Sequence, residues 1–176
     1  LHPGSARLLL RTLTSPRSRP PAVAITAFLP EGRGSLDALR PLVESVAGDD
    51  GWVPHTATWV VAMDHDTGRR VAFGRTGAPP AGLADAVMAS CAIPGWYAPV
   101  TIGDRRYLDG GVCSPFNADL LAGLGLDEVY VLAPMASLRL DAASSVPVRV
   151  ERTLRRAATR RLLREVDKVR RSGTAV

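Results

Sequence analysis

The chain has 176 residues, 46% hydrophobic and 22% charged, a composition that supports a folded core and excludes a disordered or fibrous protein. It has no apolar run of the roughly 20 residues that a membrane-spanning helix needs. Its two cysteines lack the spacing of a disulfide framework or a zinc site. The net charge of +5 comes from one segment, because residues 149–171 hold ten basic and three acidic residues and the remainder sums to −2. A nucleic-acid-binding surface over the whole protein is therefore not expected.

The N-terminal third of the sequence predicts short helices joined by an irregular connector. Residues 6–13 fit the end of a helix. Residues 14–34 are rich in proline, glycine and arginine, with an apolar stretch at 22–29 that fits either a short helix or a strand. Ser35 is placed to cap a helix that continues to about Val46. The first thirty residues hold arginine but no acidic residue, a pattern that mimics a transit peptide and that we attribute to where the chain begins.

The middle of the sequence predicts two β-hairpins on either side of a helix of small residues. The predicted elements are strands at 57–63 and 69–74, a helix at 80–92, and strands at 100–102 and 105–108. The first hairpin turns through the sequence DHDTG, and the second leads directly into Asp109-Gly110-Gly111. Because helices and strands alternate, the expected fold class is α/β.

The C-terminal residues combine a strand pattern with a long basic helix. Residues 117–124 predict a short helix. The apolar run at 128–133 predicts a buried strand that lacks a neighbour without strands N-terminal to this chain, so we expect exposed apolar surface there. Residues 148–171 repeat apolar residues at steps of three and four between arginines. This helix either lies on anionic lipid or docks on the protein with solvated arginines, and we favour the second because three acids interrupt its polar face.

Asp109 is the residue best placed to carry chemistry. A carboxylate that ends a strand and precedes two glycines lies where backbones approach closely and where α/β proteins bind ligands. Such an aspartate can act as a general base or orient one. An Asp-Gly turn with no function has the same local pattern and is common. The tripeptide alone favours the turn, and the residues around it decide between the two interpretations.

Those residues form an ordered series. Residues 89–100 read ASCAIPGWYAPV, residues 107–112 read YLDGGV, and the earlier hairpin at 59–75 reads WVVAMDHDTGRRVAFGR with a D-x-x-T-G turn. The series, from about Trp59 to Ala136, resembles the C-terminal part of the patatin-like phospholipase family. The arginine-rich composition is compatible with actinobacterial members.

The resemblance implies a three-layer α/β/α fold, of which this chain would hold the part that follows the nucleophile elbow. Family members are lipid acyl hydrolases that use a Ser–Asp dyad and require no metal or organic cofactor. By its place in the motif, Asp109 takes the role of general base, while Gly110 and Gly111 let the loop pass close to the serine. A dry pocket can raise the pKa of a lone carboxylate toward the working pH. The implied organisation is a patatin-like domain over residues 1–136 and a basic helical segment at 137–176 packed on it or following it.

The sequence departs from the family at the nucleophile. It has no G-x-S-x-G motif and no glycine-rich oxyanion loop, both of which lie N-terminal to the matched residues in the family. Since the chain also begins with Leu1 rather than methionine, we interpret it as a fragment of a longer hydrolase. The alternative is a patatin-like protein without a nucleophile that binds lipid or a partner. His2, His55 and His65 are expected at the surface, and a Ser-His-Asp triad has no support.

Four further residues receive provisional roles. Trp96 and Tyr97 follow the AIPG residues near the expected site and are assigned to the substrate pocket. Cys91 and Cys113 are expected to be small buried residues. The expected partner is a lipid or a carboxylic ester, in a cytoplasmic protein that can also contact a membrane peripherally, and no nucleic acid is expected.

Overall fold

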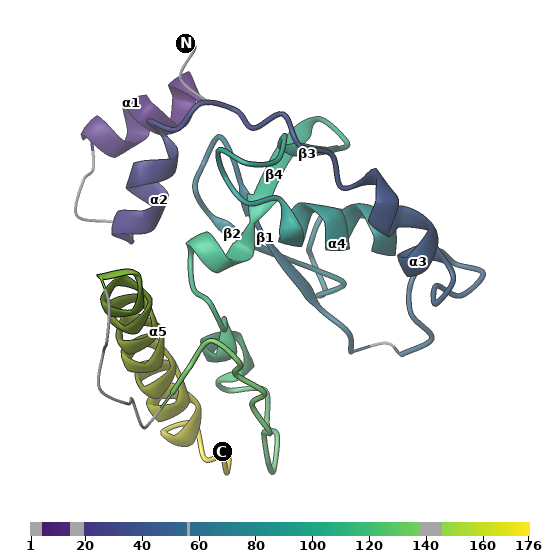
Figure 1. The fold of residues 1–176 in the computed structure, drawn as a ribbon. Coiled ribbons are helices and arrows are strands. Elements are labelled where there is room, and N and C mark those ends of the chain that lie inside the picture. The colour runs from purple at the N-terminus through teal and green to yellow at the C-terminus, as the bar shows by residue number, and fades with distance from the viewer. Residues whose placement is uncertain (1–4, 15–19, 56, 138–145) are drawn as a thin grey trace. The chain divides into compact units, whose positions relative to one another are not determined.

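The computed structural model describes residues 5–14, 20–55, 57–137 and 146–176 (Figure 1). It divides into two compact units, Leu1–Cys113 (unit 1) and Ser114–Val176 (unit 2). Among the described residues, no helix combines the length and the apolar character needed to cross a membrane.

Unit 1 is built on a four-stranded antiparallel sheet with the strand order β2-β1-β4-β3. The strands are β1 (Val60–Asp64), β2 (Arg70–Phe73), β3 (Val100–Ile102) and β4 (Arg105–Asp109). The helices are α1 (Ala6–Thr14), α2 (Pro21–Thr26), α3 (Arg40–Glu44) and α4 (Leu83–Cys91), with 3-10 turns η2 (Asp37–Leu39) and η3 (Gly110–Val112). Both predicted hairpins are confirmed, and the combination of helices with a sheet confirms the α/β class.

The turn between β1 and β2 is fixed by hydrogen bonds to Asp64. Its Oδ1 atom accepts the N–H groups of Asp66 at 3.1 Å and Thr67 at 2.8 Å, and its carbonyl accepts the Gly68 N–H at 2.8 Å. Gly68 has a φ of 65°, in the left-handed region that glycine adopts without strain. Arg105 of β4 completes the arrangement with an ion pair to Asp64 Oδ2 at 2.7 Å. The D-x-x-T-G pattern therefore specifies this hairpin through its side chains.

The sheet of unit 1 separates two apolar clusters. One cluster includes α1 and α2 and consists of Leu8, Val23, Ala27, Met63, Ala92, Leu108 and Cys113. The other includes α4 and consists of Ala62, Phe73, Ala86, Ala89, Ile102 and Tyr107. Successive residues of a strand point to opposite faces, so Ala62 and Met63 of β1 enter different clusters. The sheet therefore has helices packed on both faces.

The helix predicted from Ser35 to about Val46 is broken into two short pieces, η2 and α3. The Ser35 hydroxyl accepts the Asp37 N–H at 3.0 Å, as a cap does. Pro41 stands in the first turn of α3 and has no N–H to donate to the carbonyl four residues earlier, so helical hydrogen bonding does not continue through it from the cap. Two apolar side chains of the predicted helix lie in solvent, since Leu42 is 67% exposed and Val46 is 60% exposed.

Unit 2 consists mainly of one long helix, α5 (Val146–Arg170), and the 3-10 turn η4 (Ala118–Leu121). The basic helix predicted at 148–171 is confirmed, whereas the helix predicted at 117–124 is a shorter turn of a tighter kind. Ala158, Val166 and Val169 of α5 are buried, and α5 packs against η4. The helix thus docks on its own unit with most of its arginines in solvent.

The strand predicted at 128–133 does not form. Only Glu128 makes a bridge, to Ala175, while Tyr130 is 83% exposed and Leu132 is 94% exposed. A strand is stabilised by a hydrogen-bonded ladder with a neighbour, and the described part of unit 2 supplies no more than this bridge. The exposed apolar surface expected at this segment is present.

Candidate active site

Asp109 is the last residue of β4 and lies where the sheet meets the end of α4. It stands opposite Ala62 of β1 in the strand register. Its N–H donates to the carbonyl of Ala92, the residue that follows α4, at 3.0 Å. The backbone that carries the carboxylate is therefore fixed by a neighbouring strand on one side and a helix end on the other.

The surroundings of the Asp109 carboxylate favour its neutral form. Burial raises the pKa of Asp109, and the N–H of Gly111, which donates to Oδ1 at 2.7 Å, offsets part of that rise. Among the described residues, Gly111 is its one hydrogen-bond donor, and no arginine or lysine forms an ion pair with it. A desolvated carboxylate without a cationic partner is a better proton acceptor than an exposed one.

Gly110 and Gly111 each have a steric reason to be glycine. A Cβ on Gly110 would lie 2.4 Å from the carbonyl oxygen of Val61, so β1 and the loop after β4 approach closely only without a side chain there. A Cβ on Gly111 would lie 3.0 Å from Asp109 Oδ1, close enough to push the carboxylate away from the Gly111 N–H. The glycine pair therefore packs the loop on β1 and leaves room for the carboxylate.

Cys91 places a thiol near the same carboxylate. Partial desolvation raises the pKa of the Cys91 thiol, and the negative charge of Asp109 raises it further. The expectation that both cysteines are buried is wrong for Cys91, which is exposed, and right for Cys113. Cys91 is the last residue of α4, and this helix turns Ala86 and Ala89 toward the sheet instead.

Trp96 and Tyr97 stack on each other with ring centroids 6.4 Å apart. Tyr97 packs against the cluster that contains Leu108 and lines a cavity of about 10 Å³, which is space for about one water molecule. Trp96 is 69% exposed. A cavity of this size does not accommodate an acyl chain, so the assignment of Trp96 and Tyr97 to a substrate pocket stays a prediction.

His65 lines this small cavity and is not the surface residue that was expected. It is 2% exposed, and its Nδ1 atom has no hydrogen-bond partner among the described residues. Burial and the charge of Arg106 lower the pKa of His65, and the nearby carboxylates, Asp66 foremost, oppose them only in part. Its N–H donates to the Arg106 carbonyl at 2.8 Å, so pairing with β4 draws this residue of the turn inward.

A serine–carboxylate contact that the sequence interpretation missed lies inside unit 2. The Ser114 hydroxyl donates to Glu165 Oε1, and the two residues are 1% and 3% exposed. Glu165 also accepts the Ala118 N–H at 2.9 Å and the Arg161 Nε–H at 2.7 Å. Because both partners are buried and these bonds join α5 to the segment at η4, the contact is structural.

The position of Glu165 on α5 was the available signal for that contact. Glu165 lies seven residues after Ala158 and four before Val169, which places it on the apolar row of the helix. A carboxylate on a buried row needs donors opposite it. The sequence interpretation instead treated Glu165 as an interruption of the polar face.

The site of unit 1 offers a proton acceptor without a nucleophile bonded to it among the described residues. Asp109 can accept a proton, but no serine hydroxyl donates to it among the described residues. The described residues also contain no group of three or more histidine, cysteine, aspartate or glutamate side chains that could hold a metal ion. The arrangement can therefore serve a hydroxyl nucleophile that another segment brings to Asp109.

Comparisons with known proteins point to one family. A family model described as patatin-like phospholipase matches residues 13–122. Uncharacterized NTE family proteins from Mycobacterium bovis and from two strains of Mycobacterium tuberculosis are each 38% identical over 92 residues. The match covers 52% of this chain and 23% of each relative, so the chain spans about a quarter of the length of these relatives.

Proposed function

The chain belongs to the patatin-like phospholipase family, and from that premise we propose that Asp109 is the general base of a Ser–Asp dyad in a lipid acyl hydrolase. The nucleophilic serine of this proposal lies N-terminal to Leu1, because the 176 residues contain no G-x-S-x-G motif. The family match covers the hairpins, α4 and the Asp109-Gly110-Gly111 loop.

In the proposed reaction the serine hydroxyl gives its proton to the Asp109 carboxylate while its oxygen attacks the carbonyl carbon of the ester. The ester C–O bond then breaks, the leaving alcohol takes the proton from Asp109, and the serine keeps the acyl group. A water molecule next gives its proton to Asp109 and attacks the acyl carbon. The serine oxygen leaves with that proton, and the carboxylic acid is released.

The observation that carries the proposal is the state of the Asp109 carboxylate. A serine hydroxyl is a poor nucleophile until a base takes its proton, and a carboxylate does this better as its pKa rises toward the working pH. Burial supplies that rise at Asp109, and no cation opposes it among the described residues. Gly110 and the Ala92 carbonyl hold the residue on rigid elements.

A serine-reactive phosphonate tests the proposal in the longest polypeptide that contains this chain. We expect one serine to be labelled, with parallel loss of hydrolysis of a carboxylic ester, whereas the 176-residue chain alone should neither be labelled at an active serine nor hydrolyse the ester. Absence of both labelling and hydrolysis in the longer polypeptide would contradict the proposal.

The alternative is a patatin-like protein that lacks a nucleophile and binds lipid or a partner. The observation that favours it is the missing G-x-S-x-G motif. Lipid binding by the longer polypeptide without phosphonate labelling would support this alternative.

Three further features belong to the same proposal. We assign Trp96 and Tyr97 to the wall of the substrate site, which follows from their place after the AIPG residues that follow α4. We divide the protein into a patatin-like domain at 1–136 and a basic helical segment at 137–176. We place the protein in the cytoplasm with a lipid or ester as substrate and a peripheral membrane contact.

A further inference from the structure

The outward face of α1 is apolar. Leu8 and Thr12 point into unit 1 and are buried, which places Leu10 and Leu13 on the opposite side of this short helix. Leu10 is 64% exposed and Leu13 is 66% exposed. A helix that only covered a core would carry polar residues at these positions.

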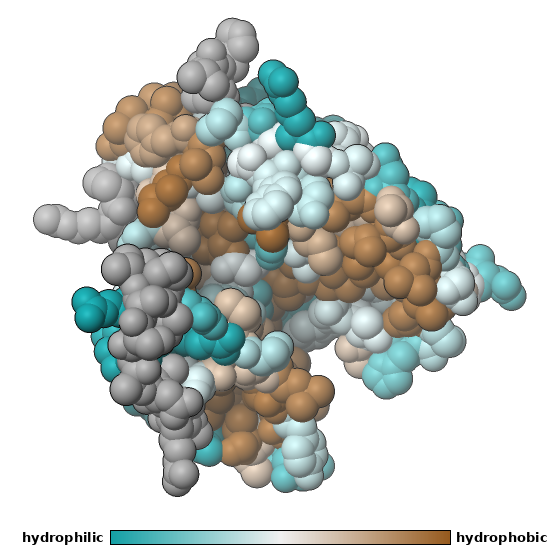
Figure 2. All heavy atoms as spheres, viewed as in Figure 1, coloured by the Kyte–Doolittle hydropathy of each residue, from teal (hydrophilic) through white to brown (hydrophobic). Residues whose placement is uncertain are grey.

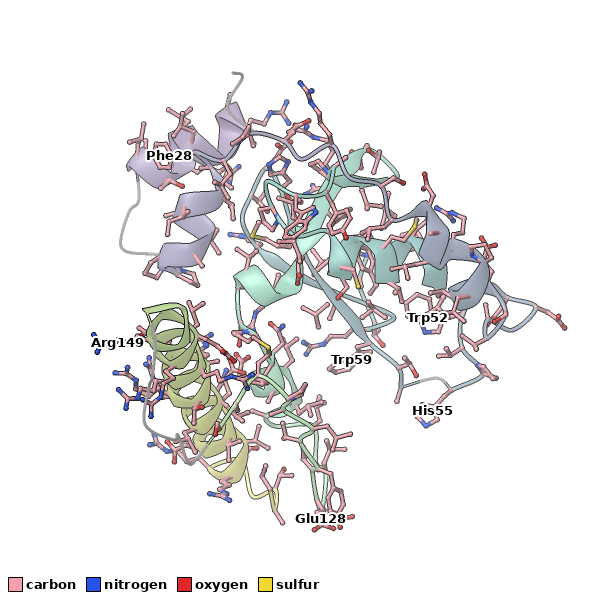
Figure 3. All side chains as sticks on the ribbon, in the orientation of Figure 1. Phe28, Trp52, His55, Trp59, Glu128 and Arg149 are labelled. Atoms are coloured by element: carbon pink, nitrogen blue, oxygen red, sulfur yellow. The ribbon has the colours of Figure 1, made fainter. Side chains whose placement is uncertain are left out.

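The segment of α2 repeats this arrangement. Val23 and Ala27 are buried, whereas Ile25 is 60% exposed and Phe28 is 63% exposed. Ile25 and Phe28 are three residues apart, as Leu10 and Leu13 are, and α1 contacts α2. Figure 2 shows hydrophobic surface over both helices, and Phe28 is labelled in Figure 3. We call these four side chains, Leu10, Leu13, Ile25 and Phe28, the α1–α2 surface.

The α1–α2 surface is anchored next to the residues that hold Asp109. Leu8 and Val23 share an apolar cluster with Leu108 and Ala92, and Ala92 accepts the Asp109 N–H. Ser5 fixes the start of α1, since its hydroxyl donates to Asp66 at 2.8 Å. The α1–α2 surface is therefore the outer side of helices whose inner side packs on the residues that hold Asp109.

The charged residues beside the α1–α2 surface indicate the kind of partner that it fits. Helix α1 contains Arg7 and Arg11 and no acidic residue. Arg7 and Arg11 of α1 stand beside its apolar outward face, and Arg7 is 81% exposed while its guanidinium lies 3.6 Å from Asp66. Exposed apolar side chains flanked by arginines fit the interface of a bilayer with anionic headgroups.

We propose that the α1–α2 surface docks this protein on an anionic lipid bilayer, with Leu10, Leu13, Ile25 and Phe28 entering the interface and Arg7 and Arg11 meeting the headgroups. Docking does not require the dyad, but its use in delivering lipid to Asp109 rests on the proposed function.

Flotation of the 176-residue chain with vesicles tests the docking. Bound protein floats with vesicles in a density gradient whereas aggregates sediment, so self-association does not imitate binding. The probes are vesicles of phosphatidylcholine alone and of phosphatidylcholine mixed with phosphatidylglycerol. The chain should float with the mixed vesicles, and binding should weaken when the salt is raised to about 0.5 M.

The decisive variant carries Leu13→Ser and Phe28→Ser. Its matched control carries Leu42→Ser and Val46→Ser on and beside α3, which are 67% and 60% exposed in the same unit. We expect the first variant to bind mixed vesicles more weakly than the unmodified chain by about tenfold or more. The control should stay within about twofold of the unmodified chain. Both variants change exposed side chains, so unfolding does not explain a difference between them.

Two further variants test whether binding depends on the arginines and whether it depends on Asp109. Replacement of Arg7 and Arg11 by glutamine should weaken binding about fivefold per arginine on mixed vesicles and little on phosphatidylcholine alone. Asp109→Asn should bind as the unmodified chain does, so a failure of the dyad and a failure of docking give different results. Equal binding by the serine pair and its control would overturn the proposal. The proposal would also be overturned if the serine pair reduced self-association of the chain but not its flotation. The α1–α2 surface would then bind a second copy of the chain.

Discussion

Unit 1 and unit 2 bury their interiors by different means. Unit 1 packs helices on both faces of a sheet whose strands are paired along their lengths, and large apolar side chains such as Phe73 and Met63 are fully buried. Unit 2 has one long helix, and the polar contact between Glu165 and Ser114 lies among its buried residues. Unit 2 also leaves Leu132 almost entirely in solvent.

The difference shows what a strand-like sequence requires. Strands are predicted at both 105–108 and 128–133, but β4 lies between β1 and β3 and pairs with both. Residues 128–133 make one bridge at Glu128 and expose their alternate apolar side chains. Backbone partners, rather than composition, decide which segment becomes a strand.

The largest stability effect is expected at the polar centre of unit 2. Glu165→Ala removes the acceptor of Ser114, Ala118 and Arg161, so we expect a loss of about 3 kcal/mol or more in the stability of unit 2. Hydrogen exchange of peptides from α5 measures it. Glu151→Ala is the control, because that carboxylate is 57% exposed, pairs with Arg155 at the helix surface and should cost under about 0.5 kcal/mol. Equal losses of stability for the two substitutions would show that the buried contacts of Glu165 do not stabilise unit 2.

The corresponding test in unit 1 is Gly110→Ala. The new Cβ would meet the Val61 carbonyl oxygen at 2.4 Å, and separating β1 from the loop should cost about 2–3 kcal/mol. Gly82→Ala is the control, since a Cβ there has Asp85 Oδ2 at 3.7 Å as its one near neighbour. Thermal unfolding compares them, and a Gly110→Ala protein as stable as the Gly82→Ala protein would show that the loop does not need this close approach.

Acid should weaken unit 1 through Asp64. Burial tends to raise the pKa of Asp64, but hydrogen bonds from Arg105 and Thr67 outweigh it and hold the pKa below 3.8. The contribution of Asp64 is therefore complete above about pH 3.8 and is lost as the pH falls through the folded-state value.

Arg105→Gln should accordingly lower the stability of unit 1 near neutral pH, and the difference from the unmodified chain should shrink as the pH falls below about 3.8. Urea unfolding at a series of pH values measures the difference, with Arg69→Gln at an exposed position of the same hairpin as the control. If the difference in stability does not change with pH, the ion pair between Arg105 and Asp64 is not its source.

The smallest stability effect is expected at the exposed segment of unit 2. Leu132→Ser changes a side chain that is 94% exposed, so stability should stay within about 0.5 kcal/mol. Self-association should fall, because an unpaired apolar segment is a template for pairing with other chains. Light scattering measures it. A large loss of stability would mean that Leu132 is buried, and would break the contrast between the units.

Local chemistry explains which elements could be predicted. The first hairpin follows from the Asp64 turn and Gly68, and α5 from the period of its apolar residues. The helix predicted from Ser35 is too long because Pro41 interrupts helical hydrogen bonding within it. The strand at 128–133 was predicted from composition, which carries no information on whether a neighbour is present.

The candidate site was predictable where a motif fixes it. Asp109 and its two glycines follow from the motif, and the structure adds the reason for each glycine. The burial of His65 was not predictable, because it depends on pairing with Arg106 some forty residues later. The domain boundary at 136 and the pocket assignment of Trp96 and Tyr97 stay predictions.

The most direct test of the account is the ester hydrolysis rate of the longer polypeptide that carries Asp109→Asn, with Asp104→Asn in the neighbouring turn as control. The account predicts a fall of about a thousandfold for Asp109→Asn, because asparagine cannot take the serine proton, and a rate within about twofold of normal for Asp104→Asn. Near-normal turnover by the Asp109→Asn enzyme would contradict the assignment of Asp109 as the base.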